Sequence, residues 1–190
     1  MKNQYQKKIA LLFILFFLSA CQSTLIKTGD SYLEIPGQAT IEITQSVDVA
    51  PNSARAFFQN GEMIRYGQLN LYDINCEIEI NTISEKYQTI EAGVFNIISI
   101  AQEESPIVKR QFTGKPVMIA SLNYAWAYDS PVDIKRYYHF KVSAQDSERN
   151  SEVVVRAIIC RGAQDTPYNA ELPTYEQMRV AGGRYIQFNF

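Results

Sequence analysis

The chain has 190 residues, with 18 basic and 20 acidic side chains, one His and three Cys, and its formal net charge is −2. The first 20 residues hold three lysines and no acid, so the other 170 carry 15 basic against 20 acidic side chains, a net charge of −5. This acidic balance argues against sequence-independent nucleic-acid binding, which needs a basic face, and one His with few Cys leaves little for a zinc site.

The N-terminus begins with a positive segment that leads into an almost unbroken apolar stretch. The stretch covers residues 9–20, and Ser19 is its only polar residue. Its length matches the apolar core of a secretion signal and falls short of the about 20 residues that a helix needs to cross a bilayer. The sequence therefore predicts a signal peptide over residues 1–20.

The apolar stretch ends in Leu18-Ser19-Ala20-Cys21, which resembles the lipobox of bacterial lipoprotein precursors. The resemblance implies cleavage before Cys21, a diacylglyceryl group on its thiol and acylation of the new amino terminus. More than one acyl chain is what stable membrane anchoring requires. Gln22 resembles the default residue for export to the outer membrane, so the expected location is that membrane, facing the periplasm. The alternatives are an ordinary signal peptide and a buried helix with a chance Cys.

The rest of the chain has the composition of a β-domain. After the signal it holds 19 Ile and 11 Val against 6 Leu, with 11 Tyr and 7 Phe, and β-branched and aromatic residues favour strands. We expect a polar, lipidated tether over residues 21–30 and a single β-rich domain over residues 31–190. The run from Ala54 to Ile80 resembles uncharacterised proteobacterial lipoproteins, none of them in a named family.

The first half of the domain shows clear strand patterns. Apolar and polar residues alternate from Ile41 to Val49, which predicts a strand with one buried face. Asn60-Gly61, between the runs 54–59 and 62–66, predicts a hairpin with a type I′ turn. Alternation returns from Ile74 to Ile80.

The second half predicts further strands and one helix. The strand candidates cover residues 94–100, 107–112, 117–128, 134–142, 153–160 and 185–190, and residues 147–151 read as a turn. Pro173-Thr174 opens a short helix and Gly182-Gly183 ends it. The whole pattern predicts a mainly β protein: an antiparallel β-sandwich or open barrel of seven to nine strands, with a short C-terminal helix before the last strand.

Once Cys21 is assigned to lipid, an even number of cysteines remains, namely Cys76 and Cys160. Each lies in an expected strand, and Cys76 shares its parity with Ile74, Ile78 and Ile80. In an oxidising compartment these features predict a disulfide. The alternative is two separate buried thiols.

An aromatic cluster is the candidate interface. Tyr124, Trp126 and Tyr128 share one strand face, and Tyr137 and Tyr138 follow in the next expected strand. Rows of Tyr and Trp stack on sugar rings or anchor protein interfaces. The alternative is that these rings fill the core.

Candidate catalytic groups are few. His139, Asp129 and Asp133 have the types of a nucleophile-activating set, but no serine elbow accompanies them. Glu77 and Glu79 lie two apart on one strand face, and paired carboxylates are the catalytic groups of glycosidases, although a solvated face is the simpler interpretation. We therefore predict no catalytic residue, no metal ligand and no cofactor.

These patterns favour a non-enzymatic outer-membrane lipoprotein whose β-domain binds another envelope component, in a structural or assembly role. The expected partners are the membrane, through Cys21, and a protein or the cell wall. One alternative is a periplasmic ligand-binding or enzyme-inhibiting module. The other is a hydrolase with an unrecognised site.

Overall fold

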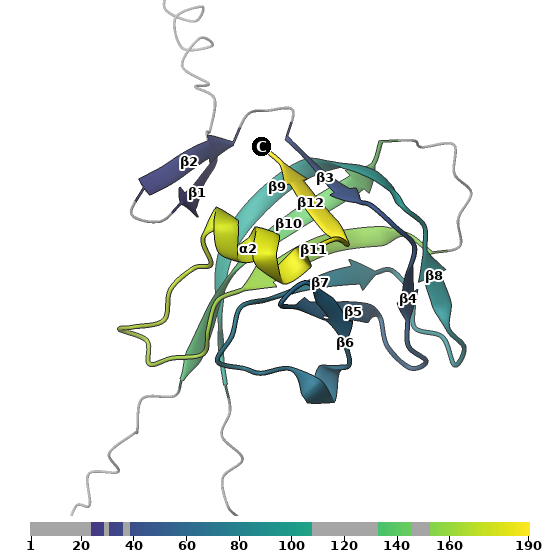
Figure 1. The fold of residues 1–190 in the computed structure, drawn as a ribbon, viewed down its shortest axis with the longest axis horizontal. Coiled ribbons are helices and arrows are strands. Elements are labelled where there is room, and N and C mark those ends of the chain that lie inside the picture. Colours follow the sequence, from purple (N-terminus) through teal and green to yellow (C-terminus); the bar gives the residue numbers. More distant parts are fainter. Residues whose placement is uncertain (1–23, 29–30, 36–38, 108–132, 146–152) are drawn as a thin grey trace, which may run out of the picture.

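The computed structural model describes residues 24–28, 31–35, 39–107, 133–145 and 153–190 (Figure 1). In chain order they form β1 (Thr24–Thr28), β2 (Ser31–Ile35), β3 (Thr40–Ile43), β4 (Val47–Val49), β5 (Arg55–Gln59), β6 (Glu62–Ile64), the 3-10 helix η1 (Tyr66–Gln68), β7 (Asn75–Ile80), β8 (Gln88–Ile90), β9 (Gly93–Pro106), β10 (Ile134–Ala144), β11 (Val155–Arg161), α2 (Tyr175–Gly182) and β12 (Ile186–Asn189). Apart from Ile107, the expected strands over 107–112 and 117–128 and the expected turn over 147–151 lie outside these residues.

Eight strands form one antiparallel sheet in the order β12-β3-β9-β10-β11-β7-β5-β6. The sheet curls into a half-barrel, and α2 packs against β5, β7 and β12 (Figure 1). The expected mainly β class, with a short helix before the last strand, is confirmed, and of the two expected architectures the open barrel is the one observed. No helix within the described ranges is long and apolar enough to span a membrane.

The concave side of the sheet holds the core. Phe58, Ile78, Tyr138 and Phe140 are fully buried there, together with Met178 of α2. The amphipathic alternation of the strands explains this burial, because every second side chain points inward. On β12, Ile186 and Phe188 take the inward positions, as the pattern predicts.

Local signals set the turn and the helix as expected. Asn60 and Gly61 both have positive φ, 54° and 79°, which a type I′ turn requires. Thr174 caps α2 by accepting from the backbone N–H of Gln177, whose side chain accepts from the backbone N–H of Thr174 in return, and this capping box satisfies two otherwise unpaired donors.

The strand boundaries differ from expectation where pairing changes. The run 41–49 is not one strand, because β3 pairs with β9 and β12 whereas β4 pairs with β8. Between them the Thr44 hydroxyl donates to the carbonyl of Arg184. β8 was not expected. β9 continues past residue 100 to Pro106, because β10 pairs with it as far as Ile134 opposite Pro106.

The described part of the expected tether is a strand. β1 covers residues 24–28 and pairs with β2, from Thr24 opposite Ile35 to Thr28 opposite Ser31. The signal was present in the sequence, since Thr24, Ile26 and Thr28 are β-branched and favour extended backbone. Residues 22–30 are mostly polar, and for this reason a tether rather than a strand was expected there.

We expect Gly162→Ala to lower the free energy of unfolding by about 2 kcal/mol. The added Cβ would lie 2.1 Å from the carbonyl oxygen of Glu171 and 3.2 Å from that of Arg136, and both are backbone atoms. Urea unfolding measures the loss. Gly67→Ala is the matched control, because nothing lies within 4 Å of its added Cβ; an equal loss in both variants would contradict the steric explanation.

Candidate functional site: a polar belt on the outer face of the sheet

Side chains on the convex face of the sheet form a continuous polar network across five strands. On β10, Tyr138 and Phe140 point into the core, so Tyr137 and His139 point outward. We use the name polar belt for the network that these two outward residues make with their neighbours. Its members are Glu103, Tyr137, His139, Arg161, Glu77, Arg55 and Glu79.

The β9 and β10 part of the polar belt is centred on Glu103. The Tyr137 hydroxyl donates to one carboxylate oxygen at 2.8 Å, and His139 Nδ1 lies 3.1 Å from the other. These two bonds, Tyr137 first, lower the pKa of Glu103 below its usual value. Burial, and then the bond to Glu103, raise the pKa of Tyr137.

Arg161 links this part to β7 and β5. Its guanidinium carbon lies 4.5 Å from the centre of the Tyr137 ring, a cation–π distance. Its Nη2 atom lies 2.7 Å from Glu77 Oε1, and Arg55 Nη1 lies 3.1 Å from the same oxygen. Arg55 also reaches Glu79, with Nη2 2.6 Å from Oε2. Charge therefore alternates in sign along the belt.

Glu77 is not on a solvated face, contrary to the simpler interpretation of its sequence. Its side chain is 3% exposed, whereas that of Glu79 is 21% exposed. A buried carboxylate needs compensation for the water that it loses, and the two arginines supply it. Their side chains come from β5 and β11, far from Glu77 in sequence, so alternation within β7 alone could not reveal the burial.

Lys135 lies at one end of this face and is only 5% exposed. Its ammonium makes no hydrogen bond or ion pair with any residue that the structure describes. Burial, reinforced by the charge of Arg161 and opposed by Glu77, lowers the pKa of Lys135 to about 8. Local sequence pattern did not indicate the roles of this residue, nor those of Arg55, Glu103 and Arg161, because partners across strands depend on register.

Replacing Lys135 by Met is expected to stabilise the protein at pH 7 and to remove a pH dependence. The pKa of Lys135 falls from 10.5 to about 8 on folding, so between these values the unfolded chain binds more protons and stability rises with pH. The gain from pH 7 to pH 9.5 is about 2 kcal/mol. Urea unfolding at both pH values tests this. Lys141→Met, at an exposed position of the same strand, should keep the rise in the free energy of unfolding. If that rise survives in Lys135→Met, Lys135 is not the group that causes it.

The predicted disulfide is present. Cys76 and Cys160 stand directly opposite each other on β7 and β11, with their Cα atoms 4.1 Å apart. Both are fully buried. The close spacing is that of a pair whose backbones do not hydrogen-bond to each other, which brings the two Cβ atoms close enough to bridge.

The aromatic cluster does not form one surface. Tyr138 is fully buried and belongs to the core, as the alternative interpretation has it, whereas Tyr137 lies on the outer face in the polar belt. Tyr124, Trp126 and Tyr128 lie outside the residues that the structure describes.

The catalytic candidates are also separated. Asp133 and His139 are six residues apart along an extended segment, or about 20 Å. Asp133 accepts from the Gln164 side chain, whereas His139 meets Glu103. Asp129 lies outside the described residues. The structure does bring Glu77, Glu79, Tyr137 and His139 into one network, but each contacts a partner that the sequence did not indicate.

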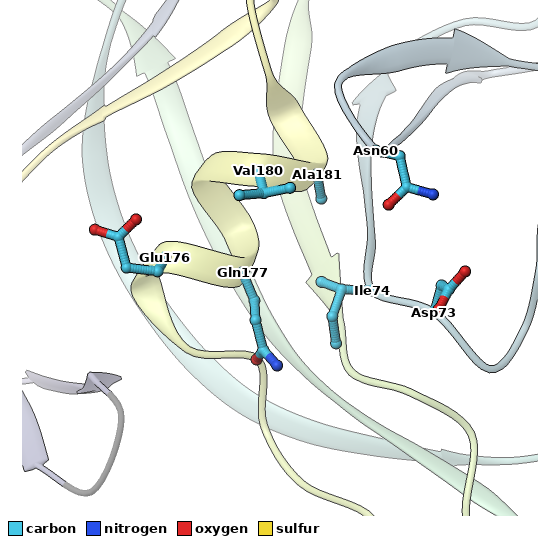
Figure 2. A pocket seen from close by; sticks show the side chains of 7 residues that line it. All are labelled: Asn60, Asp73, Ile74, Glu176, Gln177, Val180 and Ala181. Carbon is cyan, nitrogen blue, oxygen red and sulfur yellow. The ribbon is translucent and has the colours of Figure 1, made fainter.

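A shallow hollow of about 300 Å³ lies between the β5–β6 turn, the start of β7 and α2 (Figure 2). It is lined by Asn60, Asp73, Ile74, Glu176, Gln177, Val180 and Ala181. The acids are already engaged, Asp73 by the Asn70 amide and Glu176 by Arg179, each at 2.8 Å. The hollow is at the small end of the range for ligand sites.

Comparisons of the chain with protein-family models, with curated proteins and with solved structures return no match. Among the described residues, no group of three or more His, Cys, Asp or Glu could hold a metal ion. What the polar belt can do chemically therefore follows from its own groups. Its carboxylates are engaged by arginine, tyrosine or histidine, and this arrangement holds charges of both signs at fixed places on a sheet.

Proposed function

We propose that this protein is a lipid-anchored outer-membrane lipoprotein whose domain binds another component of the cell envelope through the polar belt. The observation that carries the proposal is the belt itself, a set of charged side chains fixed by one another across five strands. Charges held in place on a rigid scaffold need no ordering when a partner arrives. Complementary charge also gives an interface its specificity.

The exposed members define where a partner would make contact. The side chains of Glu103, Arg55 and His139 are between 34% and 43% exposed, whereas those of Arg161 and Glu77 are only 17% and 3% exposed. The buried pair supports the exposed groups, since Arg161 holds both Glu77 and the Tyr137 ring. The expected partner therefore carries charges that complement a surface of mixed sign.

Cross-linking in whole cells tests the partner. The tagged full-length chain should enrich one envelope component, and Glu103→Lys should lose it, because reversing an exposed charge repels the partner. Glu85→Lys makes the same substitution at an exposed position in the β7–β8 connection, outside the polar belt, and should keep it. Capture that is unaffected by Glu103→Lys would count against the belt as the binding surface.

The anchor rests on the lipobox resemblance at Cys21, and it makes a separate prediction. Cys21→Ala should abolish the incorporation of labelled palmitate, because the acyl chains have no attachment point without the thiol. Fractionation with labelled palmitate measures both location and acylation. Ser23→Ala, beside the lipobox, should remain membrane-bound. A Cys21→Ala variant that incorporates as much palmitate as the wild type would refute the anchor.

A ligand-binding or inhibitor role is the second candidate, and the hollow of Figure 2 is the observation that favours it. Three of its lining residues are apolar, Ile74, Val180 and Ala181, and the other four are polar. An enzyme side chain or a small ligand would fit such a site. Lysozyme, a cell-wall hydrolase, is the enzyme used to test this role. Val180→Arg would fill the hollow, so inhibition of lysozyme that survives this change would argue against the hollow as the binding site.

A further inference from the structure

One side of β9 is unpaired over most of the length of the strand. β10 pairs with the other side as far as Pro106. On the side away from β10, β3 pairs with residues 93–96 only, and one further bond runs from the Ile97 N–H to the carbonyl of Ala39. Beyond Ile97, no strand that the structure describes pairs with this side. We call the side of β9 that faces away from β10, from Ser99 to Ser105, the free edge.

The hydrogen-bond pattern shows which backbone groups point outward from the free edge. The Ile107 N–H donates to the carbonyl of Asp133, so these two residues are a hydrogen-bonded pair. Because bonded and non-bonded pairs alternate along an antiparallel ladder, the odd-numbered residues from 99 to 105 bond to β10. The N–H and C=O groups of Ile100 and Glu104 therefore point away from β10. A row of outward backbone groups on an edge strand is a template for a further strand.

Strand β2 has an open edge of its own. The N-terminal hairpin forms a separate two-stranded sheet, in which β2 pairs with β1 (Figure 1). Thr28 lies opposite Ser31, and only two residues separate them, so this pair is joined by the hydrogen bond that closes a turn. By the same alternation, Tyr32 and Glu34 aim their N–H and C=O groups away from β1.

The chain joins these two edges in a suitable direction and at a suitable distance. β3 runs antiparallel to β9, with Thr40 opposite Asn96, and β2 precedes β3 in the chain. Continued in the same register, Ile35 would lie opposite Ala101. Ile35 precedes Ala39 by four residues, which reach at most about 14 Å, and four steps along β9 cover about 13 Å. The connection is therefore long enough for β2 to lie along the free edge.

The same register brings the outward backbone groups of the two edges together. It places Tyr32 opposite Glu104, and each of these residues aims its N–H and C=O at the other strand. It also places Ser31 opposite Ser105, as a pair whose backbones bond to β1 and β10 instead. A shift by one residue would set outward groups against groups that are already bonded.

We propose that the free edge of β9 is a strand-acceptor site and that its occupant is β2 of the same chain. Added there, β2 continues the line of β3 along β9 and bonds to the backbone groups of the free edge, as in recognition by strand addition. β1 contacts α2 in the structure, so this is a second position of the hairpin, which exchanges those contacts for strand pairing. Docking of β2 also covers an edge that is otherwise open to another chain. Neither the polar belt nor the lipid anchor is needed for this docking.

Engineered disulfides in the full chain test the docking. Two matched pairs, Ile35→Cys/Ala101→Cys and Ser31→Cys/Ser105→Cys, join positions that the register places opposite each other, where the Cα atoms of a non-hydrogen-bonded pair are about 4.5 Å apart. Two crossed pairs, Ile35→Cys/Ser105→Cys and Ser31→Cys/Ala101→Cys, use the same four positions but separate the thiols by about 13 Å along the strands. The purified chains are oxidised with copper phenanthroline, and peptide mapping by mass spectrometry identifies each bond. Non-reducing electrophoresis separates bonds within one chain from bonds between chains.

Both matched pairs should form a bond within the chain, and both crossed pairs should not. The Cys76–Cys160 bond appears in the same map and shows that the sheet has folded in each variant, and the map also distinguishes any bond that involves Cys21. Absence of both matched bonds in a folded chain, or equal bonding of the crossed pairs, would overturn the docking of β2. Matched bonds that form only between two chains would overturn it as well, because the occupant would then be a second copy.

Discussion

Replacing Cys76 and Cys160 together by alanine should lower the free energy of unfolding by about 4–5 kcal/mol. The two residues are 84 positions apart in sequence, and the bond restricts an unfolded loop of that length. In the folded state it joins two residues that the pairing of β7 with β11 already places opposite each other. Its effect therefore falls mainly on the unfolded chain.

This loss is a large share of the roughly 5–15 kcal/mol that stabilises a typical domain. Urea unfolding of the oxidised wild type and of the double variant measures it. Adding reductant should bring the wild type close to the double variant and leave the double variant unchanged. A loss below about 1 kcal/mol would show that the bond does not stabilise the domain in this way.

Glu77→Gln should cost about 3 kcal/mol of unfolding free energy. The substitution keeps the size of the side chain and removes the charge that compensates Arg55 and Arg161. Arg161 is the more sensitive of the two, because its side chain is 17% exposed and Glu77 is the acid paired with it among the described residues. Arg55 would still have Glu79 as a partner, and its side chain is more exposed to water than that of Arg161.

Glu79→Gln is the matched control for this prediction. Arg55 would retain Glu77, and Glu79 is the more exposed carboxylate, so the cost should stay below about 1 kcal/mol. The double variant Glu77→Met/Arg161→Met should recover much of the loss, because apolar side chains can replace a buried ion pair. If Glu77→Gln and Glu79→Gln lower the free energy of unfolding equally, the burial of Glu77 between two arginines does not decide the cost.

The disulfide was predictable because its signals are local. Cys76 lies on the apolar parity of its strand, and an even pair of cysteines remains after Cys21. The directly opposed positions on β7 and β11 depend on register, but burial of both residues in one core was enough to make the pair plausible. The β5–β6 turn and α2 were predictable for the same reason, since Asn60-Gly61, Thr174 and Gly183 act on the backbone within a few residues.

The polar belt was not predictable from local pattern. Alternation in β7 places the side chain of Glu77 on the other face of the sheet from that of Cys76. In a sheet with one solvated face, a side chain in this position is expected to be exposed to water. Burial of Glu77 arises because Arg55 and Arg161, from two neighbouring strands, converge on one carboxylate oxygen. Glu103 was missed for a related reason, since the strand that carries it extends through charged residues only because β10 pairs with it.

The β class, the hairpin turn at Asn60-Gly61, the capped helix and the cysteine pair could all be read from the amino-acid sequence, because each follows from residue type and short-range periodicity. It also carries the lipobox resemblance on which the proposed anchor rests. The burial of Glu77 and of Lys135 became visible only in the folded chain. Both depend on the register between strands far apart in the sequence, and register is set by the packing of the whole sheet.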